Sequence, residues 1–249
     1  MKADIIEQRI RKTIEWLREQ VELSHTKGLV VGISGGIDSA VVGCLIQRAF
    51  PNNSLGVIIP IKSSPSDLED ARELVRTSSL KAIEIDLSQV RLDMLNRVEK
   101  EMGSLWKEEY RRISDANMRA RLRMTCLYTV ANNLGYLVVG TDNAAELYTG
   151  YFTKHGDGGV DILPLAHLTK EEVYEWAQYL QVPQSILDKA PSADLWEGQT
   201  DENEMGTTYA CIDAHLRGES IPEKDLTVIE KLHRNSEHKR HTPLQPPKF

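Results

Sequence analysis

The stretch "VVGISGGIDSAVVGCLIQRAF", residues 30–50, joins an apolar β-branched run to a helical pattern through a glycine-rich loop. The loop spans residues 34–39, and the helix is predicted to begin near Asp38. A helix N-terminus offers unpaired backbone N–H groups and the positive end of the helix dipole, and glycines let a ligand come close to the backbone. The stretch therefore predicts a strand, a loop and a helix that hold an anion, most simply a phosphate group.

The loop differs from the two common phosphate-binding signatures. It has no Gly-Lys-Ser/Thr ending and no G-x-G-x-x-G spacing. A carboxylate at Asp38 repels a phosphate unless a cation lies between them, and Mg²⁺ favours such mixed carboxylate and phosphate ligands. Asp38 therefore predicts a magnesium-bound pyrophosphate. The alternative is a tight strand-to-helix turn in which Asp38 only stabilises the helix dipole.

Outward from this loop, short apolar runs alternate with helical patterns. Strands are expected at 28–33, 54–60, 81–87 and 135–141, and helices at 3–23, 38–50, 66–78, 114–133, 203–217 and 223–234, with a further helix starting at 168–173. This alternation predicts an α/β fold, a doubly wound parallel sheet with helices on both faces, in a single domain spanning 1–249. Its expected parts are an N-terminal helix at 3–24, a sheet core with the phosphate loop at 28–141, and substrate loops with C-terminal helices at 142–249.

Composition excludes several classes of protein. The net charge is −7 and there is no long basic stripe, so no nucleic-acid partner is expected. No apolar run reaches the roughly 20 residues that span a bilayer, and the charged N-terminus is unlike a secretory signal, so no membrane partner is expected. Three widely spaced cysteines, all in expected helices, indicate reduced thiols and a cytoplasmic protein.

Two later motifs carry charged side chains. "NMRARLRMTCLY", residues 117–128, sets Arg119, Arg121 and Arg123 two apart on an expected helix, where neighbours point roughly 200° apart and cannot share one face. "GTDNAAELYTGYFTKHGDGGVDILPLAHLTKEEV", residues 140–173, begins at the end of the fourth expected strand, where open α/β sheets bind ligands. It brings acidic and basic side chains onto a glycine-rich loop; these are Asp142, Glu146, Lys154, Asp157, Asp161 and Lys170.

These motifs together resemble a known enzyme family. "SGGIDS" resembles the pyrophosphate loop of the ATP pyrophosphatases, which cleave ATP between its α- and β-phosphates. The ordered set SGGIDS, NMRARLRM, GTDNAAE, GYFTKHGDGGVDILPL, PSADLWEGQTDE and HKR resembles the NAD synthetase family across nearly the whole chain. Residues 61–68 and 100–112 lie outside this likeness, which leaves the contacts to adenine open.

The resemblance implies ATP-dependent amidation of deamido-NAD to NAD with ammonia, through an adenylate, with Mg²⁺ as cofactor and ATP as co-substrate. Asp38, Lys170 and Asp157 are the catalytic candidates, and Asp38 and Glu146 are the implied metal ligands. The implied deamido-NAD contacts are Arg121, Lys154, Asp161, His238 and Lys239. The implied ATP contacts are Gly32, Ile33, Ser34, Gly35, Gly36, Ile37, Asp38, Ser39, Thr141, Lys170 and Ser192.

Two other functions fit parts of the pattern. One is an ATP pyrophosphatase that adenylates a different acid or an RNA base, and the other is an ATP-binding sensor without catalysis. No glutaminase segment with a cysteine nucleophile is recognisable, so ammonia is the expected nitrogen donor, either free or supplied by a separate glutaminase. The resemblance also implies a homodimer, and the apolar stripe of the helix at 114–133 is its expected interface element.

Overall fold

A computed structural model describes residues 2–192, 200–243 and 245–248. Its sheet is parallel, in the order β3-β2-β1-β4, formed by the strands β1 (Gly28–Gly32), β2 (Ser54–Ile58), β3 (Ala82–Glu84) and β4 (Tyr136–Val138). The apolar runs predicted these four strands, each ending a few residues early. The α/β fold with a parallel sheet is therefore confirmed.

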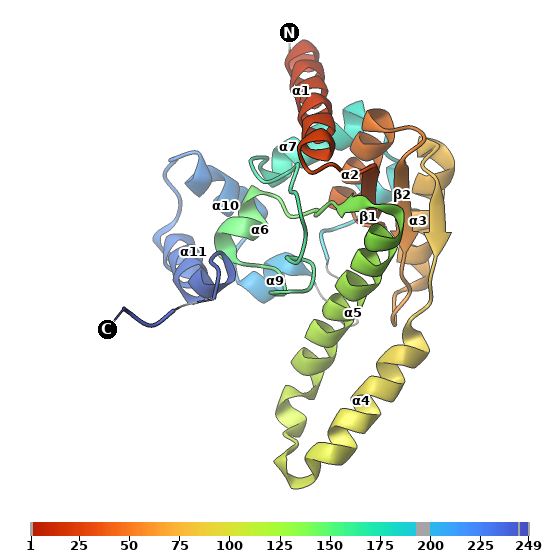
Figure 1. Cartoon of the computed structure of the whole chain (residues 1–249). Coiled ribbons are helices and arrows are strands. Elements are labelled where there is room, and N and C mark those ends of the chain that lie inside the picture. The colour runs from red at the N-terminus through yellow and green to blue at the C-terminus, as the bar shows by residue number, and fades with distance from the viewer. Residues whose placement is uncertain (1, 193–199, 244, 249) are drawn as a thin grey trace.

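Helices cover both faces of the sheet (Figure 1). The largest hydrophobic cluster lies on one face, where the central strands pack against the helices α1 (Lys2–Leu23), α2 (Ile37–Ala49), α3 (Pro65–Ser78) and α7 (Lys170–Tyr179). On the other face, Val30, Val57 and Val138 pack against α5 (Arg111–Leu134). Burial on both faces explains why β1 and β2 are continuous apolar runs, whereas the edge strand β3 is largely exposed.

The strand order places two loops side by side. β1 pairs with β2 on one side and with β4 on the other, so the chain turns in opposite directions after β1 and after β4. The glycine-rich loop follows β1, and residues 139–143 follow β4 at the same carboxyl edge of the sheet. This is the switch point at which open parallel sheets bind their ligands.

The helix α4 (Ser88–Met102) was not predicted from the sequence. It pairs with α5 in a hairpin that extends well beyond the sheet (Figure 1), with the short 3₁₀ helices η1 (Gly103–Leu105) and η2 (Glu108–Tyr110) at its turn. One face of the helix carries an apolar stripe formed by Val90, Met94, Leu95, Val98 and Met102, of which only Leu95 is buried. The sequence therefore contained the spacing of an amphipathic helix here, although most of its apolar face is exposed in the single chain.

The last third of the chain forms a smaller cluster beside α6 (Ala144–Thr149). It contains α9 (Asp201–Met205), α10 (Tyr209–Leu216), α11 (Glu223–Asn235) and η3 (Glu237–Lys239), whereas α8 (Gln184–Leu187) packs against α7 in the largest cluster. The single helix expected at 203–217 is divided because Gly206 has a positive φ of 76° and Thr208 caps a new helix through the backbone N–H of Cys211.

In the part of the chain that the structure describes, no helix combines the length and apolarity needed to span a bilayer. The three cysteines lie in helices, as the sequence predicted, and are free thiols. Burial raises the pKa of Cys44 to about 11, so this thiol stays protonated and unreactive at neutral pH.

We predict that Leu45→Ala lowers the free energy of unfolding by about 2–5 kcal/mol, because Leu45 is fully buried where α2 meets the sheet. Urea unfolding measures the change. Leu23→Ala is the matched control: Leu23 is 72% exposed, so its truncation changes stability by no more than about 0.5 kcal/mol. Equal losses for the two variants would contradict the packing described for α2.

Candidate active site

The glycine-rich loop is held by its own serines. Ser39 Oγ accepts from the backbone N–H of Ser34 at 3.2 Å and donates to the carbonyl of Gly36 at 2.9 Å. Ser34 Oγ accepts from the N–H of Gly36 and lies 3.1 Å from Ser39 Oγ. Gly36 precedes α2 and no side chain caps the helix. The first N–H groups of this 13-residue helix therefore face a preformed loop and are available to an anion.

Gly35 shows why the loop needs a glycine. Its φ is +87°, and a Cβ built on it would lie 2.2 Å from the backbone carbonyl of Asp67 at the start of α3. Backbone cannot move aside as a flexible side chain can, so any other residue here would displace α3 or the loop. Lys189 fixes the same part of α3, since its Nζ pairs with Asp67 at 2.5 Å and also with Asp70.

The structure brings three of the predicted residues together beside this loop. Lys170 Nζ lies 2.6 Å from Asp38 Oδ2 and 3.4 Å from Glu146 Oε1. Asp38 comes from the first turn of α2, Glu146 from α6 and Lys170 from the first position of α7. Residues more than a hundred positions apart in the sequence thus meet at the switch point of the sheet. We call them the charged triad.

Lys170 is only 4% exposed, which makes its charge dependent on the two carboxylates. Burial lowers the pKa of Lys170, but Asp38 and Glu146 raise it, and the net direction is upward. Burial and the charge of Asp38 raise the pKa of Glu146, while Lys170 opposes them. A buried cation shared by two carboxylates, with shifted pKa values on both sides, is typical of functional sites.

Hydrogen bonds to the helix termini hold the charged triad in place. Asn143 caps α6: its Oδ1 accepts from the N–H groups of Ala145 and Glu146, and its Nδ2 donates to Asp38 Oδ1 at 3.0 Å. At α7, Asp213 accepts from the backbone N–H groups of Lys170 and Glu171 at 3.2 and 3.1 Å. Asn143 is fully buried, so one side chain couples the start of α6 to the start of α2.

Asn143, Tyr209 and Asp201 were not singled out from the sequence. The spacing of Asn143 and Glu146 is that of a capping box, so this signal was present in GTDNAAE. Tyr209 donates its hydroxyl hydrogen toward Glu146 Oε1 at 3.1 Å and Asp201 Oδ2 at 3.0 Å, and Lys170 Nζ lies 4.7 Å from its ring. No local pattern marks Tyr209 or Asp201, because only tertiary packing brings α9 and α10 to the triad.

Four of the five predicted deamido-NAD residues form a second group. Arg121 donates to the carbonyl of Lys154 at 3.3 Å, and Lys154 Nζ donates to the carbonyl of His238. Lys239 Nζ donates to the carbonyls of Gly150 and Phe152 at 2.7 and 2.6 Å. These bonds tie the C-terminal η3 to the loop after α6, so α5, this loop and the chain end present their cations together.

The remaining predicted residues lie apart from these groups. Asp161 accepts from the backbone N–H of Val138 at 2.7 Å and from the Tyr128 hydroxyl at 2.9 Å, which anchors the loop to β4 and α5. Thr141 is half-buried just after β4, and Ser192 is exposed. The rest of the motif that Ser192 begins, residues 193–199, lies outside the described residues.

Three of the arginines of α5, Arg119, Arg121 and Arg123, point to different surroundings, as their spacing predicted. Arg119 is 1% exposed and lies 3.6 Å from Asp115, which also holds Arg91 of α4 at 2.7 Å. Arg123 donates to the carbonyl of Ile59 and to Ser63 at 3.3 and 3.2 Å. Arg121 alone of the three is exposed. It is therefore the arginine with room to meet a ligand.

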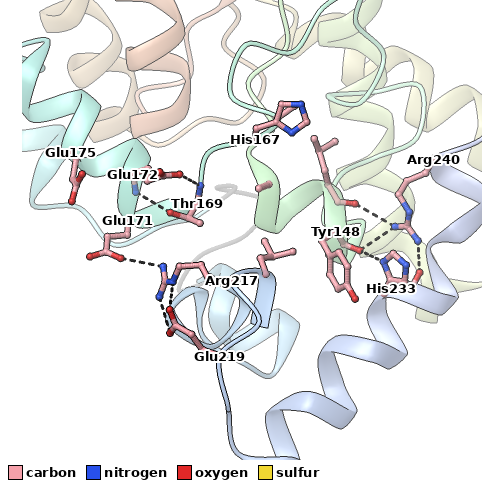
Figure 2. Close-up of a pocket in the computed structure, with 14 residues that line it drawn as sticks. Tyr148, His167, Thr169, Glu171, Glu172, Glu175, Arg217, Glu219, His233 and Arg240 are labelled. Atoms are coloured by element: carbon pink, nitrogen blue, oxygen red, sulfur yellow. Dashed lines mark hydrogen bonds and ion pairs between the residues drawn. The ribbon is translucent and has the colours of Figure 1, made fainter. Parts of the chain in front are cut away.

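A cavity of about 860 Å³ lies beside α6 and α7, two of the helices that carry the charged triad (Figure 2). Its wall includes residues next to Glu146 and Lys170 on α6 and α7, but neither of these two lines it. Figure 2 shows Arg217 turned toward Glu171 and Glu219, and the corresponding distances are 3.4 and 2.6 Å. The cavity therefore borders α6 and α7 without including Glu146 or Lys170.

Asp38 and Glu146 suit a divalent cation. Both carboxylates already converge on one positive charge, the ammonium group of Lys170. The described residues contain no group of three or more His, Cys, Asp or Glu side chains that could hold a metal ion. Mg²⁺ is commonly held by one or two carboxylates together with substrate phosphates and water, so this donor set fits magnesium bound with a nucleotide.

The parallel sheet, the glycine-rich loop at its switch point and the adjacent charged triad define a nucleotide-binding α/β protein. A model of the NAD synthase family matches residues 9–243, and the chain belongs to that family. It is 61% identical to the NH(3)-dependent NAD(+) synthetase of Alkaliphilus oremlandii, over 97% of this chain and 97% of that protein.

Two solved structures share this fold over nearly their whole length. The NMN synthetase from Francisella tularensis matches with a TM-score of 0.91 and 40% identity, covering 97% of this chain and 98% of that one. The NH3-dependent NAD synthetase from Campylobacter jejuni matches with a TM-score of 0.77 and 26% identity, covering 97% and 99%. The chain therefore resembles enzymes with two differently named products.

We predict that Lys170→Met destabilises the ligand-free protein by about 3–5 kcal/mol, because it leaves two partly buried carboxylates without their shared cation. Mg²⁺ restores more stability to this variant than to the parent protein, since the cation replaces the missing charge. Thermal unfolding with and without Mg²⁺ measures both effects. Lys224→Met, at an exposed position of α11, is the control and shows neither effect.

Proposed function

We propose that the protein is an ammonia-dependent NAD synthetase, which converts deamido-NAD to NAD with ATP and ammonia. The observation that carries this proposal is the meeting of Asp38, Glu146 and Lys170 beside a preformed phosphate loop. Family membership and the relatives named NH(3)-dependent NAD(+) synthetase support the same reaction. An ATP-binding sensor without catalysis would not require a buried lysine that is shared by two carboxylates.

In the first half-reaction, an oxygen of the nicotinate carboxylate attacks the α-phosphorus of ATP. The new C–O–P linkage forms as the bond to the β-phosphate oxygen breaks, and pyrophosphate leaves with the electron pair. The N-terminus of α2 and the loop 34–39 bind the phosphates, with Ser34 and Ser39 beside them. Lys170 lies where a cation stabilises the charge that develops on the phosphates.

In the second half-reaction, the ammonia nitrogen attacks the acyl carbon of the adenylate. The C–N bond forms, the C–O bond to AMP breaks with its electron pair on AMP, and a proton leaves the nitrogen. Arg121, Lys154, His238 and Lys239 form the expected binding surface for deamido-NAD, because they present cations from three parts of the chain. Asp161 fixes the loop that connects this surface to the sheet.

Asp38 and Glu146 are the residues that would hold Mg²⁺. When bound, this ion would neutralise charge on the phosphates. A bound cation would also change the contacts of Lys170. Its ammonium group lies between the two carboxylates in the ligand-free structure and would be released toward the phosphates when another cation satisfies them. In the ligand-free protein, Lys170 therefore neutralises the charge of Asp38 and Glu146.

A second candidate substrate is the mononucleotide acid, which would give NMN. The specific observation is the TM-score of 0.91 to an NMN synthetase, compared with 0.77 to the NAD synthetase from C. jejuni. The mononucleotide acid carries the same nicotinate carboxylate as deamido-NAD and lacks only the adenylate half. The triad and the phosphate loop would act in the same way on both acids.

We predict that purified protein with ATP, Mg²⁺ and ammonium forms one AMP for each amide formed, with deamido-NAD as the preferred acid. Chromatography quantifies NAD, NMN and AMP, with each acid supplied alone and in competition. A higher kcat/KM for the mononucleotide acid would instead assign the second candidate. Glutamine in place of ammonium, at the same nitrogen concentration, gives no product.

Two broader properties belong to this proposal. The chain acts as one unit spanning 1–249, with parts at 3–24, 28–141 and 142–249, because α7 of the last part packs on α2 and α10 packs on α7. The protein works in the cytoplasm, where its nucleotide substrates are present and thiols such as those of its three cysteines stay reduced.

The proposed active form is a homodimer joined through the α4–α5 hairpin. Nine of the twelve large apolar side chains that are exposed among the described residues lie between positions 90 and 134, so the apolar surface is concentrated there. Leu105 is 72% exposed and Tyr110 is 58% exposed. An apolar cavity of about 470 Å³ lies between the two helices and reaches Arg121, so a second copy on this surface would border the deamido-NAD residues.

We predict that the protein elutes with twice the chain mass of 28.1 kDa, and that the double substitution Met94→Asp with Val98→Asp yields a folded monomer. Both side chains are more than 40% exposed, so aspartate is tolerated in the single chain and opposed only in the dimer. Light scattering gives the mass. Leu23→Asp, at an exposed position on α1, is the control, and a monomeric parent protein would contradict this proposal.

A further inference from the structure

Arg240 is a partly buried cation that belongs to neither the charged triad nor the predicted deamido-NAD residues. Its side chain is 19% exposed, and it lies where the C-terminal ends of α6 and α11 meet (Figure 2). Nη1 donates to the carbonyls of Leu147 and Tyr148 at 3.4 and 3.2 Å, and Nη2 donates to the carbonyl of His233 at 2.5 Å. The last carbonyls of a helix lack partners within the helix, and a cation beside them is favourable. One guanidinium group therefore satisfies carbonyls at two helix ends.

The contact between these two helix ends is close. Gly150 ends α6 with a φ of +67°, and a Cβ built on it would lie 2.1 Å from Cβ of Ser236, which follows α11. Ser236 is 5% exposed, and its Oγ accepts from Nη1 of Arg240 at 2.8 Å. The ring of His233 stacks on that of Tyr148 at 4.2 Å, and its Nδ1 donates to the carbonyl of Tyr148 at 2.8 Å. A glycine thus permits the close approach, and side chains of the C-terminal segment hold it.

The two helix ends lead to different parts of the active site. α6 carries Glu146, the expected metal ligand, and Asn143 caps its N-terminal end. The chain that leaves α11 forms η3, which carries His238 and Lys239, two of the residues expected to bind deamido-NAD. Arg240 follows η3 directly and also donates to Glu237 in the first position of η3 at 2.8 Å. It therefore connects the helix of a metal ligand with the segment that binds the second substrate.

We propose that Arg240 is a positioning residue that docks η3 on the end of α6 and so holds His238 and Lys239 in the orientation that binds deamido-NAD. This inference rests on the proposed function and adds a residue to it. The two terminal nitrogens of Arg240 donate to five acceptors within the protein, so the guanidinium acts through its neighbours and not on the substrate. Because Asn143 holds the other end of α6, loss of Arg240 releases η3 and leaves Glu146 in place.

The test is Arg240→Met, which removes the guanidinium group and keeps an unbranched apolar stem. The expected result is a rise of roughly 10- to 100-fold in the KM for deamido-NAD, as when binding groups lose their position. The KM for ATP stays within about 2-fold of the parent value, and kcat at saturating deamido-NAD is retained, because binding is lost and the chemistry is not. Titration calorimetry gives the matching change in the Kd for deamido-NAD without turnover.

Two further variants separate position from charge. Arg234→Met is the matched control: Arg234 is exposed in the last turn of α11, so its loss removes the same charge from the same helix end. Its KM for deamido-NAD is expected to equal the parent value. Arg240→Lys keeps the charge without the planar fork that reaches both helix ends, so an intermediate KM is expected. This milder variant carries the test if Arg240→Met does not fold.

A double-mutant cycle shows whether Arg240 acts through its neighbour. Lys239→Met and Arg240→Met are each expected to raise the KM for deamido-NAD. If Arg240 positions Lys239, the double variant raises the KM by much less than the product of the two single effects, because the second loss has less left to disturb. A product of the two effects would instead indicate that Arg240 contacts deamido-NAD itself, and would overturn the proposal.

Hydrogen exchange provides a readout of local structure. Arg240→Met is expected to speed exchange in peptides covering 230–243, where the backbone N–H groups of Ser236 and Lys239 donate to nearby carbonyls. Exchange in α2 is expected to stay at the parent rate. Faster exchange in both regions would mean that the variant loses global stability, and that Arg240 is not a positioning residue for η3.

Three kinetic results distinguish the remaining cases. An unchanged KM for deamido-NAD in Arg240→Met would overturn the proposal. A raised KM for ATP with a raised requirement for Mg²⁺ would also overturn it, since Arg240 would then act through Glu146 on α6. Failure of the proposed function is a different result, because the parent protein itself would then form no AMP with either acid.

Discussion

The sharing of one buried ammonium group by two carboxylates is the interaction on which the rest of the site depends. Lys170 is nearly inaccessible, so its charge persists only because Asp38 and Glu146 face it. Each of the three stands in the first turn of its helix, where capping bonds from Asn143 and Asp213 set the position. The ion pairs and the capping hydrogen bonds therefore position the same three side chains, and neither set of interactions would be sufficient alone to hold them.

The sheet explains why these helices meet. With strand order β3-β2-β1-β4, the loops after β1 and β4 lie at the carboxyl edge, where open parallel sheets bind ligands. The N-terminus of α2 supplies backbone donors at that edge, and α6 and α7 supply charge. The apolar cluster beneath α1, α2 and α7 holds these helices rigidly enough for charges to be placed with accuracy.

The sequence predicted the strands and the glycine-rich loop well, because both depend on local patterns of apolar residues and glycine. It predicted Asp38, Glu146 and Lys170 through family resemblance, and the structure shows them in contact. It did not single out Tyr209 or Asp201, because their contacts with the charged triad follow from tertiary packing. The helix α4 was missed although its apolar residues recur at helical spacing, and most of them remain exposed on the hairpin.

The contact between Asp213 and the start of α7 has a consequence for synthesis of the protein. The phosphate loop emerges from the ribosome early, but the residue that caps the helix of the catalytic lysine emerges about 180 residues later. Lys239, which fastens the loop after α6, follows close to the end of the chain. A nascent chain thus contains all four strands of its sheet long before it contains the residues that complete its active site.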